Sequence, residues 1–375
     1  LLLLLAFLAC TMKNNENQPP MSEADSLSNY LSKANDFNST LSKRKEYIQK
    51  AYDIIIDQPN DSMQRVNLFK IANRYYNINN LNAYKETALV VLEKSQSSKD
   101  TLSTAKAYSY LGDYFGSQAV SDSAFLFYFK AEKIYLKRND NLNLAKARLN
   151  KAMLQYNESD FLGSEISVFK ALRVLKGEKA NDIVYECNNL LGLVYNELGE
   201  YNKAIEFHNK ALKSIDNKTS PVEFQSRATS LNNLGLVYQN LNKHKQATPY
   251  FEEGLRQEKD LMLYKPSLYA MLLDNLGYCR FKENENKGIP ELFYKSLQLR
   301  DSLQLTVGVI ISNIHLSEYY ASIGDKPKAI QYSKEALAIA RKAKNARNLL
   351  QPLQQLAIIE PSKATIYNKE YIHIN

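Results

Sequence analysis

A small residue recurs along the chain at intervals of 40 to 43 positions, and this spacing constrains the fold more than any other feature. The successive intervals are 40, 40, 40, 43, 42, 40 and 40 residues. Around the four glycines of the series the flanking residues also agree, reading SYLGDYF, NLLGLVY, NNLGLVY and DNLGYCR. A regular period of this length indicates an array of structural repeats rather than two or three separate globular domains. The residues at this first small site are Ala72, Gly112, Ala152, Gly192, Gly235, Gly277, Ser317 and Ala357.

Each repeat carries a second site twelve residues after the first, where most residues are again small. Aromatic residues recur three or four positions after these sites, such as Tyr195 after Gly192 and Phe251 after Ala247, on the same face of a helix. A small residue at one fixed place on each of two helices lets their backbones approach closely, and aromatic rings fill the remaining gaps. Each period therefore predicts one helical hairpin. The second sites are Tyr84, Ala124, Ser164, Ala204, Ala247, Ile289 and Ala329.

The composition agrees with a folded chain that has few turns. Of its 375 residues, 45% are hydrophobic and 23% are charged, which is enough apolar matter for a large core and too little net charge for disorder. Glycine occurs 12 times and proline 10 times, below their usual shares. Sandwiches, barrels and glycine-rich phosphate loops need more of both residues, so an all-β fold is disfavoured.

The unit from Asn188 to Ile215 carries the fullest motif, with Leu191, Gly192, Tyr195, Tyr201, Ala204 and Ala211 in order. This order resembles the tetratricopeptide repeat (TPR) family, in which Leu-Gly, Tyr, Ala, an aromatic residue and Ala follow through a helix-turn-helix unit. The early tryptophan of the family is missing, and Tyr108 is the nearest substitute. The resemblance implies an all-α fold, a right-handed superhelical solenoid of antiparallel helix pairs. The period exceeds the roughly 34 residues of the family, which implies helices longer by most of a turn each.

We expect the solenoid to cover residues 23–375 with about eight helix-pair repeats, degenerate at both ends. Ala51 stands 40 residues before Val91, so the segment from Leu41 to Ile56 is predicted to be the second helix of a degenerate first repeat. Near the other end Ala357 keeps the register. Pro361 follows it by only four residues, which predicts a shortened turn.

No catalytic motif is visible in the sequence. The four histidines lie far apart and lack cysteine or carboxylate neighbours at metal-ligand spacing, and HEXXH, P-loop and dinucleotide fingerprints are absent. His208 falls at a helix packing position and is predicted to be a core residue. Cys187 and Cys279 fall on first helices two repeats apart, which predicts buried free thiols rather than a disulfide. We therefore expect no enzyme activity, metal or cofactor within these residues.

Amide residues recur on the predicted first helices, close to the first small site. In the TPR family the first helices line the inner face of the superhelix, so the resemblance places these residues toward a groove. An amide side chain has an acceptor oxygen and two donor hydrogens, and a ladder of amides could hold the backbone of an extended peptide without reading its side chains. The predicted ligand-binding residues are Asn150, Asn189, Asn196, Asn232, Asn233, Gln239, Asp274, Asn275 and Asn313.

A structural interpretation of the same amides stays open. They could cap helices, hydrogen-bond between neighbouring helices, or reflect a composition rich in asparagine and lysine. Replacement of Asn189, Asn233 and Asn275 by alanine distinguishes the two interpretations. Weaker partner binding at unchanged thermal stability supports the groove, and an equal loss of stability supports a structural role.

The chain begins with an apolar run, LLLLLAFLAC, which is shorter than the roughly 20 residues of a transmembrane span and is better explained as the end of a secretory signal. Its Leu-Ala-Cys ending resembles the lipobox of bacterial lipoproteins, so residues 1–10 are predicted to be a truncated signal peptide with lipidation at Cys10. A plain signal or a truncated membrane helix with an accidental cysteine is the alternative. The polar residues 11–22 are predicted to be a tether. We expect an exported protein on the periplasmic side of a bacterial membrane, anchored by lipid.

Basic residues outnumber acidic ones by 48 to 40, which gives a net charge of +8. A solvated surface explains this excess. An anionic partner or anionic lipid headgroups would explain it too, since positive charge adds a second attachment for a lipid-anchored body. No nucleic-acid partner is expected, because the basic residues are dispersed and an exported chain would not meet nucleic acid.

The hollow side of a solenoid suits binding rather than chemistry, so a protein or an extended peptide is the expected partner. The chain is similar to the N-terminal TPR region of receptors in Bacteroidetes-type bacteria, whose repeats precede a transmembrane helix and a histidine kinase or helix-turn-helix regulator. This resemblance implies the extracytoplasmic sensory input region of a membrane signalling receptor, with the effector part after Asn375. The alternatives are a free-standing periplasmic TPR lipoprotein scaffold and a cytosolic adaptor. A run of about 20 apolar residues downstream would identify the receptor.

The last predicted helix suggests a further partner, a second copy of the chain. A terminal repeat without a polar cap leaves an apolar face open. We therefore expect self-association through the C-terminal helix. The residues of this face are Leu349, Leu350, Leu353, Leu356 and Ile359.

Overall fold

The computed structural model describes residues 23–36, 38–215, 221–256, 258–285, 288–343 and 347–374. The predicted signal peptide (1–10), the lipidation at Cys10 and the tether (11–22) lie outside these residues. Within the described ranges every regular element is a helix, which confirms the predicted all-α class. The chain divides into two compact units, of which unit 1 ends at Leu154 and unit 2 begins at Gln155.

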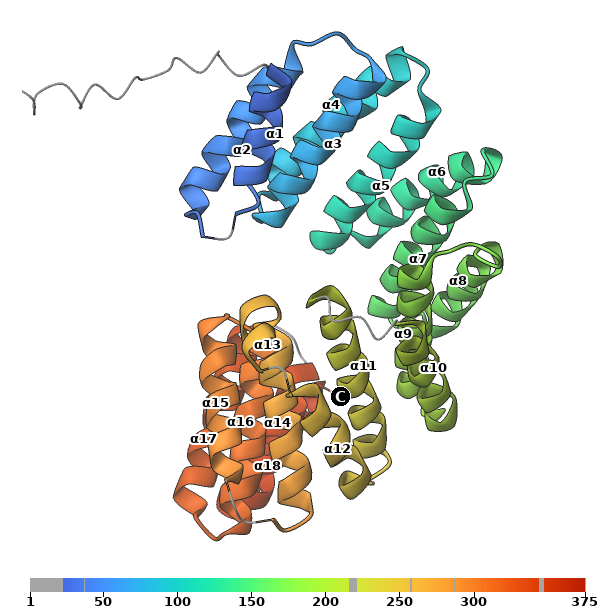
Figure 1. Ribbon diagram of the computed structural model, residues 1–375. Helices are drawn as coiled ribbons and strands as arrows, with labels where there is room; N and C mark the ends of the chain where they lie inside the picture. The colour runs from blue at the N-terminus through green and yellow to red at the C-terminus, as the bar shows by residue number, and fades with distance from the viewer. Residues whose placement is uncertain are drawn as a thin grey trace, which may run out of the picture. The chain divides into compact units, whose positions relative to one another are not determined.

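In unit 1 successive helices lie side by side from the first, α1 (Glu23–Lys33), to α6 (Ser121–Lys137) (Figure 1). Leu41–Ile56 is helical, as predicted. The helices are α1 (Glu23–Lys33), α2 (Leu41–Ile56), α3 (Ser62–Asn77), α4 (Leu81–Ser97), α5 (Thr101–Ser117), α6 (Ser121–Lys137) and most of α7 (Asn141–Asn157).

The 40-residue period follows from the lengths of these helices and turns. From α4 to α7 each helix has 17 residues, and three residues separate each helix from the next. The middle residue of each turn has a left-handed backbone, with φ of 57° at Lys99, 54° at Ala119 and 55° at Asn139, which is a common way to end a helix. The turn before α5 also supplies an N-cap, because the Asp100 side chain accepts hydrogen bonds from the backbone N–H groups of Leu102 and Ser103.

Unit 2 continues the pattern of antiparallel helix pairs, with one additional short helix, α13, between two pairs. None of the helices in the described ranges is long and apolar enough to cross a membrane. The helices are α8 (Phe161–Val174), α9 (Asn181–Glu197), α10 (Tyr201–Ser214), α11 (Pro221–Asn240), α12 (His244–Gly254), α13 (Glu258–Tyr264), α14 (Pro266–Lys282), α15 (Ile289–Ser302), α16 (Thr306–Ser322), α17 (Lys326–Lys342), α18 (Arg347–Ile359), the 3₁₀ turn η1 (Pro361–Lys363) and α19 (Ala364–Ile374).

The first small site lets the two helices of a pair approach closely, as predicted. A Cβ atom built on Gly112 would lie 2.5 Å from the ring of Tyr128, and one on Gly235 would lie 2.5 Å from the ring of Phe251. At Gly192 the ring is that of His208, again at 2.5 Å. His208 is 0% exposed, so its prediction as a core residue is confirmed.

The prediction of an open apolar face at the end of the chain was wrong. Leu353 and Leu356 on α18 are fully buried. They form one cluster with Leu337 of α17 and Tyr367 of α19. The physical reason is that α19 follows Pro361 and packs along α18, so the chain covers its own apolar face. This face therefore gives no support to self-association.

Candidate functional site

Four predicted amides of unit 2 form one hydrogen-bonded row, here called the amide ladder: Asn189, Asn232, Asn233 and Asn275. The Nδ2 atom of Asn275 donates to Oδ1 of Asn232 at 3.0 Å, across from α14 to α11. The Nδ2 atom of Asn232 donates to Oδ1 of its neighbour Asn233 at 3.3 Å. The Nδ2 atom of Asn233 donates to Oδ1 of Asn189 on α9 at 3.0 Å. The ladder thus connects the first helices of three successive pairs.

Burial decides which members of the amide ladder can meet a ligand. Asn232 is 1% exposed, and Asn233 and Asn275 are each 8% exposed. Their hydrogen bonds run between neighbouring helices, which is the arrangement of the structural interpretation. Asn189, at the end of the row, is half-buried, and its Nδ2 atom has no acceptor among the described residues. Contact of the ladder with a ligand stays a prediction, and Asn189 is the member best placed for it.

The other predicted amides of unit 2 lie apart from the ladder. Asn240 donates through Nδ2 to Oδ1 of Asn196 at 3.0 Å, which makes a second amide pair between α11 and α9, nearer to solvent. The Oε1 atom of Gln239 is buried without a hydrogen-bond partner. Asn313 is 2% exposed and donates to the backbone oxygen of Val309, one turn earlier in α16.

Asp274 lies inside unit 2, where it is 0% exposed. Its Oδ1 atom accepts from Ser312 at 2.8 Å, and its Oδ2 atom lies 2.7 Å from Nδ1 of His315 and 3.5 Å from Nη1 of Arg300. Burial alone would raise the pKa of the Asp274 carboxyl, but His315, Arg300 and Ser312 together hold it below its usual range. These contacts join α14, α15 and α16, so Asp274 serves packing between helices.

Asn150 is the predicted site residue that lies in unit 1. Its Nδ2 atom donates to Oδ1 of Asp113 at 3.2 Å, and the hydroxyl groups of Tyr128 and Tyr84 donate to the same carboxylate at 2.6 and 3.2 Å. Burial raises the pKa of Asp113 to about 6, against the lowering effect of the two tyrosine hydrogen bonds. Asn150 therefore takes part in a buried cluster of α4, α5, α6 and α7.

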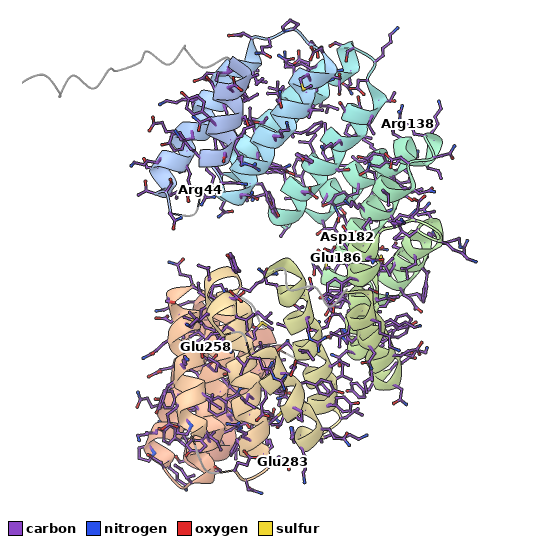
Figure 2. The ribbon with its side chains drawn as sticks, viewed as in Figure 1. Arg44, Arg138, Asp182, Glu186, Glu258 and Glu283 are labelled. Carbon is purple, nitrogen blue, oxygen red and sulfur yellow. The ribbon has the colours of Figure 1, made fainter. Side chains whose placement is uncertain are left out.

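Sequence reasoning missed a row of side chains six residues before the first small site. In unit 2 this position holds Glu186, Thr229, Met271, Ile311 and the polar Gln351. Met271 is 38% exposed and Ile311 36% exposed, although both are large and apolar. Glu186 is exposed on α9 and is labelled in Figure 2. The row lies three residues before the Asn189 position on each helix, on the same face. The repeat register would have revealed this row, because its members stand at one fixed distance from the first small site.

We call this surface the first-helix face, defined by Glu186, Asn189, Thr229, Met271 and Ile311. It offers two apolar contacts, one free amide donor and one carboxylate, which suits non-covalent binding. The two thiols of unit 2 are not part of this surface, because Cys187 and Cys279 are buried. Burial raises the pKa of each thiol to about 12. Within the described part of the chain no three His, Cys, Asp or Glu side chains gather as metal ligands would.

A family model described as Tetratricopeptide repeat matches residues 185–257. This segment corresponds to most of α9 to α12, which contains the best repeat motif of the sequence. No curated protein matches the chain.

Three solved structures show how widely the fold is shared. The apo form of the quorum sensor NprR from B. thuringiensis has a TM-score of 0.67 at 15% identity, over 93% of this chain and 96% of that one. A Rap protein complexed with Competence and Sporulation Factor has a TM-score of 0.61 at 14% identity, over 94% and 97%. The Rap conjugation gene regulator of the plasmid pLS20 in complex with the Phr* peptide has a TM-score of 0.51 at 14% identity, over 90% and 96%. These similarities show the fold, a TPR-like solenoid of helix pairs.

Proposed function

We propose that the chain is a non-catalytic module that binds a protein or an extended peptide on the first-helix face of unit 2. The observation that carries this proposal is the exposure of Met271 and Ile311 at one repeat position, in the same face as the half-buried Asn189. Exposed apolar side chains in a regular row are typical of an interaction surface. The free Nδ2 donor of Asn189 can bind a backbone carbonyl beside them.

The similar structures support a peptide as the ligand. Two of them, by their own descriptions, hold Competence and Sporulation Factor and the Phr* peptide. A solenoid of helix pairs offers an extended ligand a series of equivalent positions, one from each repeat. Met271 and Ile311 come from successive pairs, so they are positioned to contact two side chains of one peptide.

A displayed library of random 12-residue peptides tests the proposal with the full chain as bait. We expect enriched peptides whose affinity falls at least about thirtyfold in the double variant Met271→Ala and Ile311→Ala, since two apolar anchors of an interface at about 1–2 kcal/mol each contribute about 2–4 kcal/mol together. Asn189→Ala should weaken the same peptides by a smaller factor. The readout is the dissociation constant of two or three synthesised peptides.

A matched control uses exposed apolar residues outside this face. Leu162 is 66% exposed and Ile166 is 46% exposed, both on α8 of the same unit. The double variant Leu162→Ala and Ile166→Ala should bind the peptides as the wild type does. Failure to enrich any peptide, or equal losses in both double variants, would reject the first-helix face as the binding surface.

The finer role that we propose is that of an extracytoplasmic sensory input region of a membrane signalling receptor, in which lipid on Cys10 holds the module at the membrane. The sequence resemblance described above supports it. The coding sequence after Asn375 tests it, because a receptor requires a transmembrane segment of about 20 apolar residues there. Incorporation of labelled palmitate, lost in Cys10→Ala, tests the anchor.

A free-standing periplasmic lipoprotein scaffold is the alternative role. It shares the anchor and the binding face with the receptor and differs only after Asn375. A stop codon shortly after this residue, together with palmitate incorporation, would favour the scaffold over the receptor.

A further inference from the structure

A groove of about 680 Å³ runs between α1 and α3 over the end of α2, within unit 1. This volume lies within the range of roughly 300–1,000 Å³ that small-molecule sites have. Thirteen residues line the groove, and none of them is Asp or Glu. The groove is remote from the first-helix face in sequence and does not depend on the proposed function of unit 2.

The two ends of the groove differ in chemistry. One end is apolar, with Leu27 of α1, Ile54 and Ile55 at the end of α2, and Met63 at the start of α3. Leu27 and Ile55 belong to the hydrophobic core, while Met63 is 63% exposed.

The other end is polar and basic, with Asn67, Lys70 and Arg74 on one face of α3. Arg74 comes eleven positions after Met63, so the two ends are about 16 Å apart at 1.5 Å per helical residue. A ligand that fits both ends is therefore elongated.

The basic end is held in place by the end of α1. The Nε atom of Arg74 donates to the backbone oxygen of Leu31 at 3.1 Å. Arg44 of α2, labelled in Figure 2, donates in the same way to the backbone oxygen of Ala34 at 2.9 Å. Both arginines thus bind carbonyl groups that the helix end leaves free. The contact orients the guanidinium of Arg74 and leaves its two Nη groups beside the groove.

The two cations at this end lack an anionic partner. In the described residues neither Lys70 nor Arg74 forms an ion pair, and the Nζ atom of Lys70 donates to Oδ1 of Asn67 at 3.0 Å. Burial lowers the pKa of Arg74, which shows that its charge is partly removed from water without compensation. Like charges four residues apart on a helix repel each other. Packing explains the Nε contact of Arg74 and gives no reason for a second cation at Lys70.

We propose that this groove binds a linear amphiphile with one anionic end, a medium-chain carboxylate. Its carboxylate lies between Lys70 and Arg74, where an ammonium and a guanidinium donate to it. Its alkyl chain lies along Leu27 toward Ile54 and Met63 and leaves water there. One charged end and one apolar end match the two ends of the groove, and the absence of acidic residues in the lining removes repulsion.

Titration calorimetry with decanoate and decanol on the full chain tests the proposal. Decanoate should bind at least tenfold more tightly than decanol, and its affinity should fall as salt screens the cations. Lys70→Gln should weaken decanoate five- to tenfold and leave decanol unchanged, because only the charged end is lost. Arg74→Lys keeps the positive charge but loses the bidentate hydrogen bonds that a guanidinium forms with a carboxylate. It should therefore lower the affinity for decanoate by a smaller factor.

The matched control is Lys45→Gln, which removes the same charge from an exposed position of the neighbouring helix α2 that does not line the groove. It should bind decanoate as the wild type does, and melting curves should show that all variants fold. Equal affinities for decanoate and decanol, or no loss in Lys70→Gln, would overturn the proposal. So would the tripeptide Leu-Leu-Leu if it bound tenfold more tightly than decanoate. None of these outcomes bears on peptide binding by unit 2.

Discussion

At the residue scale, His208 differs in chemistry from the aromatic residues that occupy the same place in other repeats. Its ring packs on Gly192 as the rings of Phe251 and Phe293 pack on Gly235 and Gly277. Both ring nitrogens of His208 are buried without a hydrogen-bond partner. Burial lowers the pKa of His208 from 6.5 to about 4, because the charged form would lose its hydration.

This lowered pKa makes stability depend on pH. Above pH 6.5 the imidazole is neutral in both the folded and the unfolded chain, so the folded state keeps its full stability. As the pH falls from 6.5 toward 4 the unfolded chain takes up a proton that the folded chain excludes, so stability is lost with falling pH. We expect His208→Phe to gain about 2.5 kcal/mol over the wild type between pH 7.5 and 4.5. Urea unfolding followed by circular dichroism measures this gain. If the free energy of unfolding changed with pH in the same way for both proteins, the prediction would be contradicted.

Ala119 carries a backbone cost that a glycine would remove. It has a φ of 54° in the turn between α5 and α6. A residue with a Cβ atom costs about 1–2 kcal/mol in this conformation, and glycine costs about 0.5–1 kcal/mol in lost freedom on folding. Ala119→Gly should therefore raise the free energy of unfolding by about 0.5–1 kcal/mol. The preceding residue is the control, because Gln118 has a φ of −92° and Gln118→Gly should only destabilise.

At the element scale, two glycines of α5 give opposite predictions for one substitution. A Cβ on Gly112 would lie 2.5 Å from the Tyr128 ring, which the hydrogen bond from its hydroxyl to Asp113 holds in place. A Cβ on Gly116 would have ordinary contacts, the nearest at 3.5 Å to Leu154. Gly112→Ala should cost about 1–2 kcal/mol through overpacking, and Gly116→Ala should gain about 0.5 kcal/mol through helix propensity. Thermal unfolding of both variants measures this, and equal effects would show that the helix contact is not tight.

The sequence predicted the helix pairs because their packing repeats one steric demand. Where the ring of a second helix packs against the first small site, as at Gly112, Gly192 and Gly235, only a small residue fits there. This steric requirement recurs from pair to pair, so it appears in the sequence as a regular period. The left-handed turn residues were not predicted, because Lys99, Ala119 and Gln304 carry no mark of their conformation. Asparagine and glycine hold the same conformation in other turns, such as Asn79 and Gly199, so the residue type marks some of these turns and not others.

The short helix α13 also escaped prediction. The longer spacing of 42 residues from Gly235 to Gly277, which contains α13, fits evenly lengthened helices equally well. The structure instead ends α12 at Gly254, where Leu272 packs close to the glycine. It then adds α13, whose Leu261 is fully buried. The burial of Leu261 stabilises this extra helix. The local sequence does not show which part of the hydrophobic core Leu261 packs into.

The amide ladder was located by sequence without its direction. Asn232 and Asn233 are adjacent on α11, and their side chains hydrogen-bond to each other. The repeat register places both near the boundary between the exposed face and the contact with the next helix. Which amide turns inward depends on the partner helix, and here Asn275 supplies a donor on one side and Asn189 an acceptor on the other. Pairing across helices is a tertiary property, so the spacing alone could not separate a binding role from a structural one.

At the scale of the whole molecule, helix pairs that contact mainly their neighbours should unfold locally rather than all at once. Stability in such arrays is close to a sum of repeat and neighbour contributions, and the two units have separate sets of contacts. We expect Gly112→Ala to speed hydrogen–deuterium exchange in α4 to α6 of unit 1 and to leave α14 to α17 of unit 2 unchanged. Gly116→Ala is the control and should not speed exchange in either unit. Mass spectrometry of exchanged peptides measures both. A uniform increase across the chain would show instead that the molecule unfolds as one cooperative body.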